Sequence, residues 1–203
     1  MHRITGCPPW YAPLVRGKAL PPTTFDGKPV TPEEFWTSMF FSAPAARAMV
    51  KLGQGPALVK LYRSGYRDAG EFIEAADRRD MLPELAANLS VALKASGADG
   101  EASDLLLAAS SRLEQAFRRE PMRGTLARLA IVRAAQGDRP QALAAIEEAT
   151  RKGWFPDGRD ISLDLAEEPA FAGLRGEPRF EAVRKRLLDH VAQERAKLGP
   201  LKV

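Results

Sequence analysis

Apolar residues recur every three or four positions through most of the chain after residue 30. Residues with this spacing share one face of an α-helix, so the pattern predicts amphipathic helices. Glycine-centred turns separate several of these segments, at Gly53, Gly65, Gly97 and Gly137, and glycine commonly ends a helix. The sequence therefore predicts an all-α protein.

The first predicted helix starts at Thr31-Pro32-Glu33-Glu34. Thr31 can cap the helix, proline suits the first helical position, and Glu34 can complete a capping box. We expect this helix to end near Ser42. Two short helices should follow it, one from about Pro44 to Leu52 and one from about Pro56.

Three of the later helices carry a small, a large and a small residue at positions i, i+4 and i+7. These triplets are Ala69, Ile73 and Ala76; Ala102, Leu106 and Ala109; and Ala142, Ile146 and Ala149. The small residues let an antiparallel helix approach closely, and the large residue fills the space beyond it. Helix, turn and helix then form a hairpin whose apolar face only neighbouring hairpins can bury. An Ala142 that faces water would contradict this arrangement.

This pattern resembles the tetratricopeptide repeat family, whose period is about 34 residues, between about Pro56 and Trp154. The triplets start at residues 69, 102 and 142. The segment DLAEEPAFAGLRGEPRFEAVRKRL, from Asp164 to Leu187, also resembles the end of tetratricopeptide-like tails in some bacterial signalling proteins. Leu126 and Arg133 depart from the family, which often has tryptophan and tyrosine at these places. The resemblance implies a right-handed α-solenoid of stacked antiparallel helical hairpins.

The chain is expected to have two parts. Prolines interrupt residues 1–30, which also hold Trp10, Tyr11 and Phe25, so we expect an irregular, extended arm that packs on the helical body. Residues 31–203 are expected to form the helical repeat domain. A capping helix at about residues 178–198 would close it by burying Phe180 and Leu187.

Composition excludes several kinds of chemistry. One cysteine and two histidines are too few for a zinc site rich in these ligands. Neither GxxxxGK[ST] nor GxGxxG occurs, so no phosphate-binding glycine motif is present. Asp189 and His190 are adjacent on a predicted helix and therefore point in different directions. We expect no catalytic residue, no metal and no cofactor, and we interpret the protein as non-enzymatic.

No apolar run reaches the ~20 residues that span a membrane. The first residues also lack the apolar core of a signal peptide. We therefore expect no membrane insertion and a cytoplasmic location, with a periplasmic location in an envelope complex as the alternative.

The leading hypothesis is a protein–protein interaction module, an adaptor or scaffold that binds a peptide or protein on the concave face of the stack. The first helix of each hairpin would line that face. The candidate partner-binding residues are Asn88, Val91, Lys94, Ala127, Arg128 and Ile131.

Two alternatives stay open. The formal net charge is +4, and the clearest basic excess begins at residue 175. A nucleic acid or another anionic partner could bind the candidate contacts Arg175, Arg179, Arg184, Lys185 and Arg186, although we do not favour nucleic acid because Asp and Glu are mixed with Lys and Arg along most helices. The second alternative is a hydrolase with an irregular site formed by the N-terminal arm.

Overall fold

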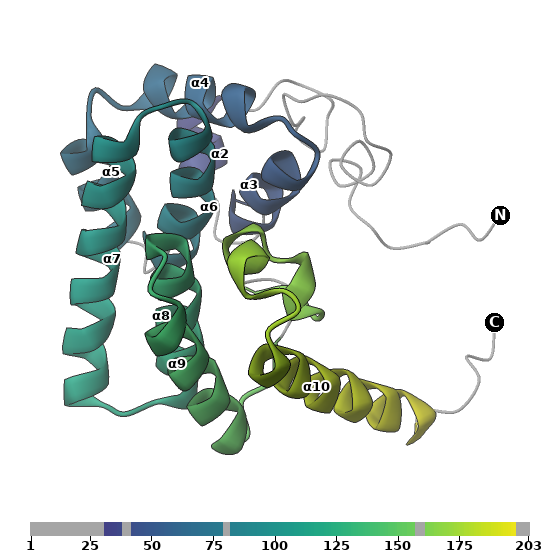
Figure 1. Ribbon diagram of the computed structural model, residues 1–203. Helices are drawn as coiled ribbons and strands as arrows, with labels where there is room; N and C mark the ends of the chain where they lie inside the picture. Colours follow the sequence, from purple (N-terminus) through teal and green to yellow (C-terminus); the bar gives the residue numbers. More distant parts are fainter. Residues whose placement is uncertain (1–30, 38–41, 79–81, 157–160, 198–203) are drawn as a thin grey trace, which may run out of the picture. The chain divides into compact units, whose positions relative to one another are not determined.

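The computed structural model describes residues 31–37, 42–78, 82–156 and 161–197. Every regular element among these residues is a helix, which confirms the all-α prediction (Figure 1). The chain divides into two compact units, residues 1–105 and 106–203, and the boundary falls inside helix α7 (Asp99–Arg119). The predicted arm, residues 1–30, lies outside the described residues.

Helix α2 (Pro32–Thr37) begins the described part of the first unit with the predicted capping box. The backbone N–H of Thr31 donates to Oε2 of Glu34 at 2.8 Å, and the backbone N–H of Glu34 donates to Oγ1 of Thr31 at 3.2 Å. The described part of this helix ends at Thr37, and the predicted end near Ser42 follows residues 38–41, which lie outside the described residues. Ser42 begins the next helix, α3 (Ser42–Lys51), and its hydroxyl donates to the carbonyl of Phe35.

Aromatic side chains from α2, α4 (Gly55–Gly65) and α5 (Ala69–Asp77), with one from the turn between α4 and α5, form a cluster in the first unit. The ring of Phe72 is central, since its centroid lies 5.1 Å from Trp36, 5.5 Å from Tyr62 and 5.1 Å from Tyr66. All three pairs meet edge to face, which brings the positive edge of one ring against the negative face of another. The cluster therefore joins three helices through one buried side chain.

Helix α6 (Leu82–Ala95) contacts α3, α4 and α5 within the first unit. Because neighbours surround it, most of its residues are buried, including polar ones. Buried polar groups need hydrogen-bond partners. The amide Nδ2 of Asn88 donates to the carbonyl of Glu84 at 3.0 Å, and the hydroxyl of Ser90 donates to the carbonyl of Ala87 at 2.9 Å. These bonds to the preceding turn allow a helix with polar residues to occupy the centre of the unit.

Helices α8 (Arg123–Gln136) and α9 (Arg139–Arg151) form an antiparallel hairpin in the second unit (Figure 1). Gly137 ends α8 with a φ of 88°, in the left-handed region that favours glycine. Asp138 caps α9, because its carboxylate accepts a bond from the backbone N–H of Gln141 at 3.2 Å. The three residues of the triplet that begins at Ala142 are all 0% exposed. Ala142 therefore faces protein, as the hairpin prediction requires.

The second unit ends in two short 3-10 helices, η1 (Leu165–Glu167) and η2 (Pro169–Leu174), and in helix α10 (Pro178–Lys197). Helix η2 contacts α8, and α10 contacts α9. The rings of Phe171 and Phe180 are fully buried, with centroids 5.5 Å apart. Helix α10 thus has nearly the bounds that we predicted for the last helix and buries Phe180 and Leu187.

The stacking of hairpins into a right-handed superhelix stays a prediction. In a regular repeat stack, each hairpin contacts only its neighbours. In the first unit, by contrast, α2 contacts α3, α4 and α5, and α6 also contacts three helices. The α8–α9 hairpin is the part of the described chain that looks most like a single repeat.

Candidate functional site

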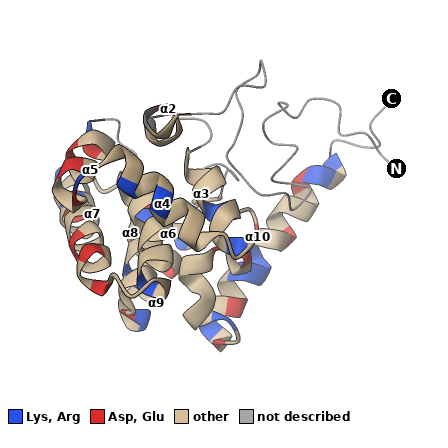
Figure 2. Ribbon diagram, turned by 90° about the horizontal axis from the view of Figure 1, so that it is seen from above, with Lys and Arg blue, Asp and Glu red and all other residues tan. Residues whose placement is uncertain are grey.

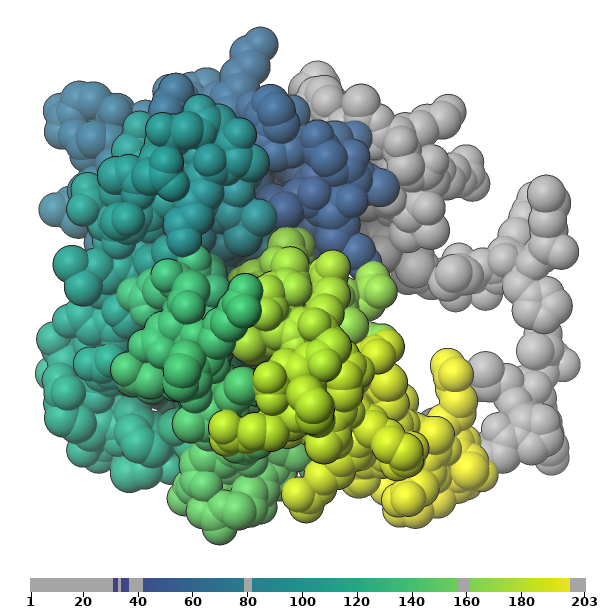
Figure 3. Space-filling model, in the orientation of Figure 1, coloured from purple at the N-terminus to yellow at the C-terminus, as the bar shows by residue number. Residues whose placement is uncertain are grey.

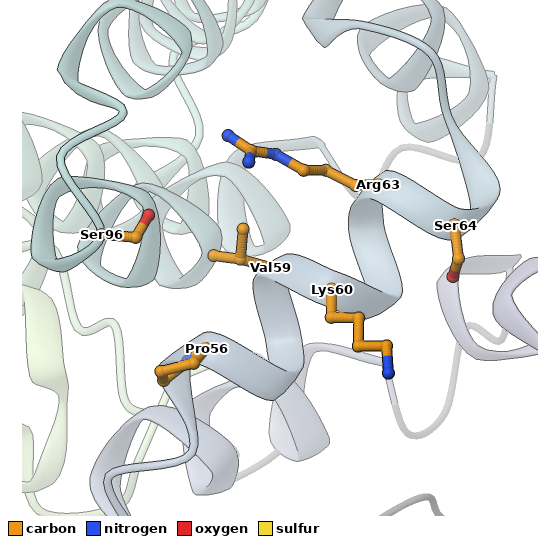
Figure 4. Close-up of a pocket in the computed structure, with 6 residues that line it drawn as sticks. All are labelled: Pro56, Val59, Lys60, Arg63, Ser64 and Ser96. Atoms are coloured by element: carbon orange, nitrogen blue, oxygen red, sulfur yellow. The ribbon is translucent and has the colours of Figure 1, made fainter.

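An open groove runs along one side of α4 in the first unit. Its volume is about 540 Å³, within the range of small-ligand pockets. It is lined by Pro56, Val59, Lys60, Arg63 and Ser64 of α4 and by Ser96, which follows the end of α6. Figure 4 shows Val59 facing Ser96 across the groove, while Lys60 and Arg63 extend away from each other. We call this feature the α4 groove.

The period of the helix explains why α4 forms this surface. Pro56, Val59, Lys60 and Arg63 stand at i, i+3, i+4 and i+7, so they share one side of the helix. Another side of α4 holds Tyr62, which is 1% exposed and lies in the aromatic cluster. Burial of that aromatic side leaves Pro56, Lys60 and Arg63 exposed, whereas Val59 is only 6% exposed.

The charges of the α4 groove are only partly neutralised. Nη2 of Arg63 lies 3.1 Å from Oε1 of Glu101, with the two side chains 56% and 36% exposed. Ion pairs this exposed contribute little to stability because water screens them. Lys60 is exposed and makes no ion pair with any residue that the structure describes. Judged by the described part of the chain, the groove therefore offers one unpaired cation, Lys60, and a second, Arg63, that a ligand can compete for.

The two serine hydroxyl groups that line the α4 groove donate to backbone carbonyls. Ser64 donates to the carbonyl of Leu61 and Ser96 to that of Leu93, each at 2.8 Å. Burial, followed by the negative charge of Glu101, raises the pKa of the Tyr62 hydroxyl above its ordinary value of 10.0, so it stays protonated near neutral pH. None of the described residues that line the α4 groove is a histidine, cysteine or carboxylate.

The six predicted partner-binding residues lie on α6 and α8, and none of them lines the α4 groove. Asn88 is 1% exposed, and Ala127 and Ile131 are 0% exposed. Within their own units these three side chains are therefore covered by protein, and their contact with a partner stays a prediction. The physical reason for the burial is that α6 is covered by α3, α4 and α5, and α8 by α9 and η2. The other three, Val91, Lys94 and Arg128, are half-buried.

Two of the five predicted anionic contacts are engaged in bidentate ion pairs. Arg179 donates to both carboxylate oxygens of Glu147 on α9, at 2.9 and 2.6 Å. Arg184 donates to both carboxylate oxygens of Asp164, which precedes η1, at 2.6 and 2.8 Å. Such fork-shaped pairs fix orientation as well as charge. These two arginines therefore attach α10 to other elements of the second unit.

The remaining three predicted anionic contacts, Arg175, Lys185 and Arg186, differ in whether they form an ion pair. Nζ of Lys185 lies 2.6 Å from Oδ2 of Asp189, one turn further along α10. Arg175 and Arg186 are exposed and make no ion pair within the described part of the chain. In Figure 2, both basic (blue) and acidic (red) positions occur along α10. The helix therefore carries charges of both signs.

The sequence pattern predicts helix α4, but it does not predict that Pro56, Val59, Lys60 and Arg63 line a groove. The spacing of apolar residues identifies the side of a helix that faces the core. Pro56, Lys60 and Arg63 are exposed, so this spacing does not identify them. The spacing i, i+3, i+4 and i+7 was the available signal. It could not reveal that Ser96, far along the chain, forms the opposite wall.

No helix among the described residues is long and apolar enough to cross a membrane. In the same residues, no group of His, Cys, Asp and Glu could hold a metal ion. No protein-family model, curated protein or solved structure matches this chain. The tetratricopeptide resemblance therefore rests on the sequence pattern alone.

Proposed function

We propose that this protein is a non-enzymatic interaction module that binds an acidic peptide segment of another protein in the α4 groove. The observation that supports this function is an open groove that has the exposed Pro56 on one wall and Lys60 at its edge, a cation with no ion-pair partner among the described residues. Complementary charge selects partners and speeds their association. The role is that of an adaptor or scaffold whose partner carries the acidic segment.

The residues of the groove suggest how such a segment binds. An apolar side chain of the peptide contacts Pro56 and Val59, and a carboxylate approaches Lys60. A second carboxylate competes with Glu101 for Arg63. This exchange costs little, because the existing pair is exposed to water.

The α4 groove differs from the concave face that a tetratricopeptide-like stack would offer to a partner. A partner on that face would need Asn88, Ala127 and Ile131, which are buried. A helical repeat protein that acts as an adaptor remains our interpretation of the chain, with the α4 groove as its contact surface.

A random peptide library displayed on phage and selected on the immobilised full chain tests this function. We expect enriched peptides that combine Asp or Glu with an apolar residue. A synthetic copy of such a peptide should bind Lys60→Glu about tenfold more weakly than the original chain, because a favourable charge pair becomes a repulsive one. Fluorescence anisotropy of the labelled peptide measures the affinity.

Arg118→Glu is the matched control. Arg118 is exposed on α7, outside the α4 groove, and the substitution changes the net charge by the same amount. The control should bind the peptide like the original chain. Enrichment of peptides without acidic residues, or equal loss of binding in both variants, would rule out a specific acidic site on α4.

A further inference from the structure

A second groove, with a volume of about 500 Å³, lies in the second unit between Phe155 and one side of α10. The residues of α10 that matter here are Lys185, Arg186, Asp189 and His190, which follow one another at helical spacing. Helix α10 forms the yellow surface in Figure 3. We call this feature the α10 groove, and it shares no residue with the α4 groove.

An aromatic ring stands at the wall of the α10 groove. The rings of Phe155 and His190 are stacked, with centroids 3.8 Å apart and planes 20° apart. Phe155 is nevertheless 40% exposed. His190 covers one face of the ring, so a flat ligand can stack only on the side that His190 leaves uncovered. An aromatic ring that is held in place and open on one side can stack with a flat ligand.

Positive charge stands beside this ring. Arg186 is exposed and forms no ion pair with the described residues, and a guanidinium group matches the geometry of phosphate oxygens. Lys185 is paired with Asp189, but the two side chains are 76% and 54% exposed. A pair this exposed is weak, so a ligand can replace Asp189 as the partner of Lys185.

We propose that the α10 groove binds a nucleoside phosphate. The base stacks on the open face of Phe155, and the phosphate group contacts Arg186 and Lys185. An acidic peptide would satisfy the two cations but would leave the ring unused, which is why we favour a ligand that joins a flat ring to an anionic group. The volume of the groove lies within the range of small-molecule sites.

Titration of the full chain with adenosine monophosphate, adenosine and inorganic phosphate tests this site. The chain has two histidines, so a His2→Gln variant is enough to assign the ring-proton NMR signals of His190. We expect these signals to shift with adenosine monophosphate along a saturating curve. Adenosine and inorganic phosphate should each bind at least about fivefold more weakly, because each makes only part of the contacts.

Four variants separate the contributions of the ring and the charges. Phe155→Leu and Arg186→Gln should each weaken binding of adenosine monophosphate at least about fivefold. Asp189→Asn should strengthen binding about twofold or more, since it frees Lys185 and removes a repelling carboxylate. A gain in affinity cannot result from misfolding. Arg175→Gln removes an exposed cation outside the α10 groove and should leave the affinity unchanged.

Three outcomes would overturn the proposal. One is the absence of any shift of the His190 signals at adenosine monophosphate concentrations up to about 20 mM. The second is unchanged affinity in both Phe155→Leu and Arg186→Gln. The third is equal affinity for adenosine monophosphate and inorganic phosphate, because the ring would then contribute nothing. None of these outcomes bears on the α4 groove, which lies in the other unit.

Discussion

At the scale of single residues, two basic side chains of α10, Arg179 and Arg184, help to hold the second unit together. Arg184 donates to Asp164 and also to Oε2 of Glu181, at 3.1 Å. Glu181 in turn accepts a bond from the backbone N–H of Gly176 at 3.2 Å. This N–H, and then the Arg184 side chain, hold the pKa of Glu181 below its ordinary value of 4.5.

Glu181 should therefore make stability depend on pH. A carboxylate whose pKa is lowered by folding contributes stability above its unfolded pKa of about 4.3, and this contribution is lost as the pH falls through the folded pKa. Glu181→Gln should thus lower the urea midpoint at neutral pH, and the difference from the original chain should shrink toward about pH 3. Glu120→Gln, which removes an exposed carboxylate at the end of α7, controls for the change in net charge. A difference that stays constant with pH would contradict the role given to Glu181.

At the scale of elements, small residues decide how closely the helices of a hairpin approach. Ala127 and Ala130 on α8 and Ala142 and Ala149 on α9 are all 0% exposed. With no side chain beyond Cβ, these residues leave room for the facing helix. Close packing of α8 against α9 therefore depends on alanine at these positions.

Ala142→Leu should destabilise the second unit by about 1–3 kcal/mol, because a larger side chain overpacks a filled interface. Ala144→Leu is a matched control, since Ala144 is exposed on the same helix and the two residue types have similar helix propensity. Thermal unfolding followed by circular dichroism measures the effect. Equal destabilisation by the two substitutions would show that the interface does not require a small residue.

At the scale of the whole molecule, the two compact units have separate groups of large buried side chains. Trp36, Tyr62 and Phe72 fill the first unit, and Phe171 and Phe180 fill the second. Each group gives its unit an apolar core of its own. We therefore expect each unit to open to hydrogen exchange with its own free energy, as separate cooperative units do.

Phe72→Leu tests this expectation. The substitution should lower the stability of the first unit by about 1–3 kcal/mol, through lost packing and lost ring contacts. Hydrogen exchange measured by mass spectrometry should then show faster exchange in α4–α6 and little change in α8–α10. Phe171→Leu should have the reverse effect. Faster exchange throughout the chain in both variants would mean that the molecule opens as one unit.

What the sequence by itself determined is local. The capping box at Thr31, the glycine that ends α8 and the cap of α9 at Asp138 all follow from residues a few positions apart. Helical period and cap chemistry act over one or two turns, so the positions of most helices and the all-α class could be predicted. The bond from the Ser42 hydroxyl to the carbonyl of Phe35 could not be predicted, because it joins residues of two different helices.

Only the tertiary structure decided which side chains are available to a partner. Asn88 looks like a binding residue on an isolated helix, yet three neighbouring helices bury it. From the sequence alone, Arg184 looks like a cation that is available to a partner. In the structure it pairs with Asp164, which is 20 residues away in the sequence. Both candidate grooves likewise combine residues from separate segments, α4 with Ser96 and α10 with Phe155. Exposure and charge pairing depend on contacts between elements distant in sequence, which periodicity along one helix cannot encode.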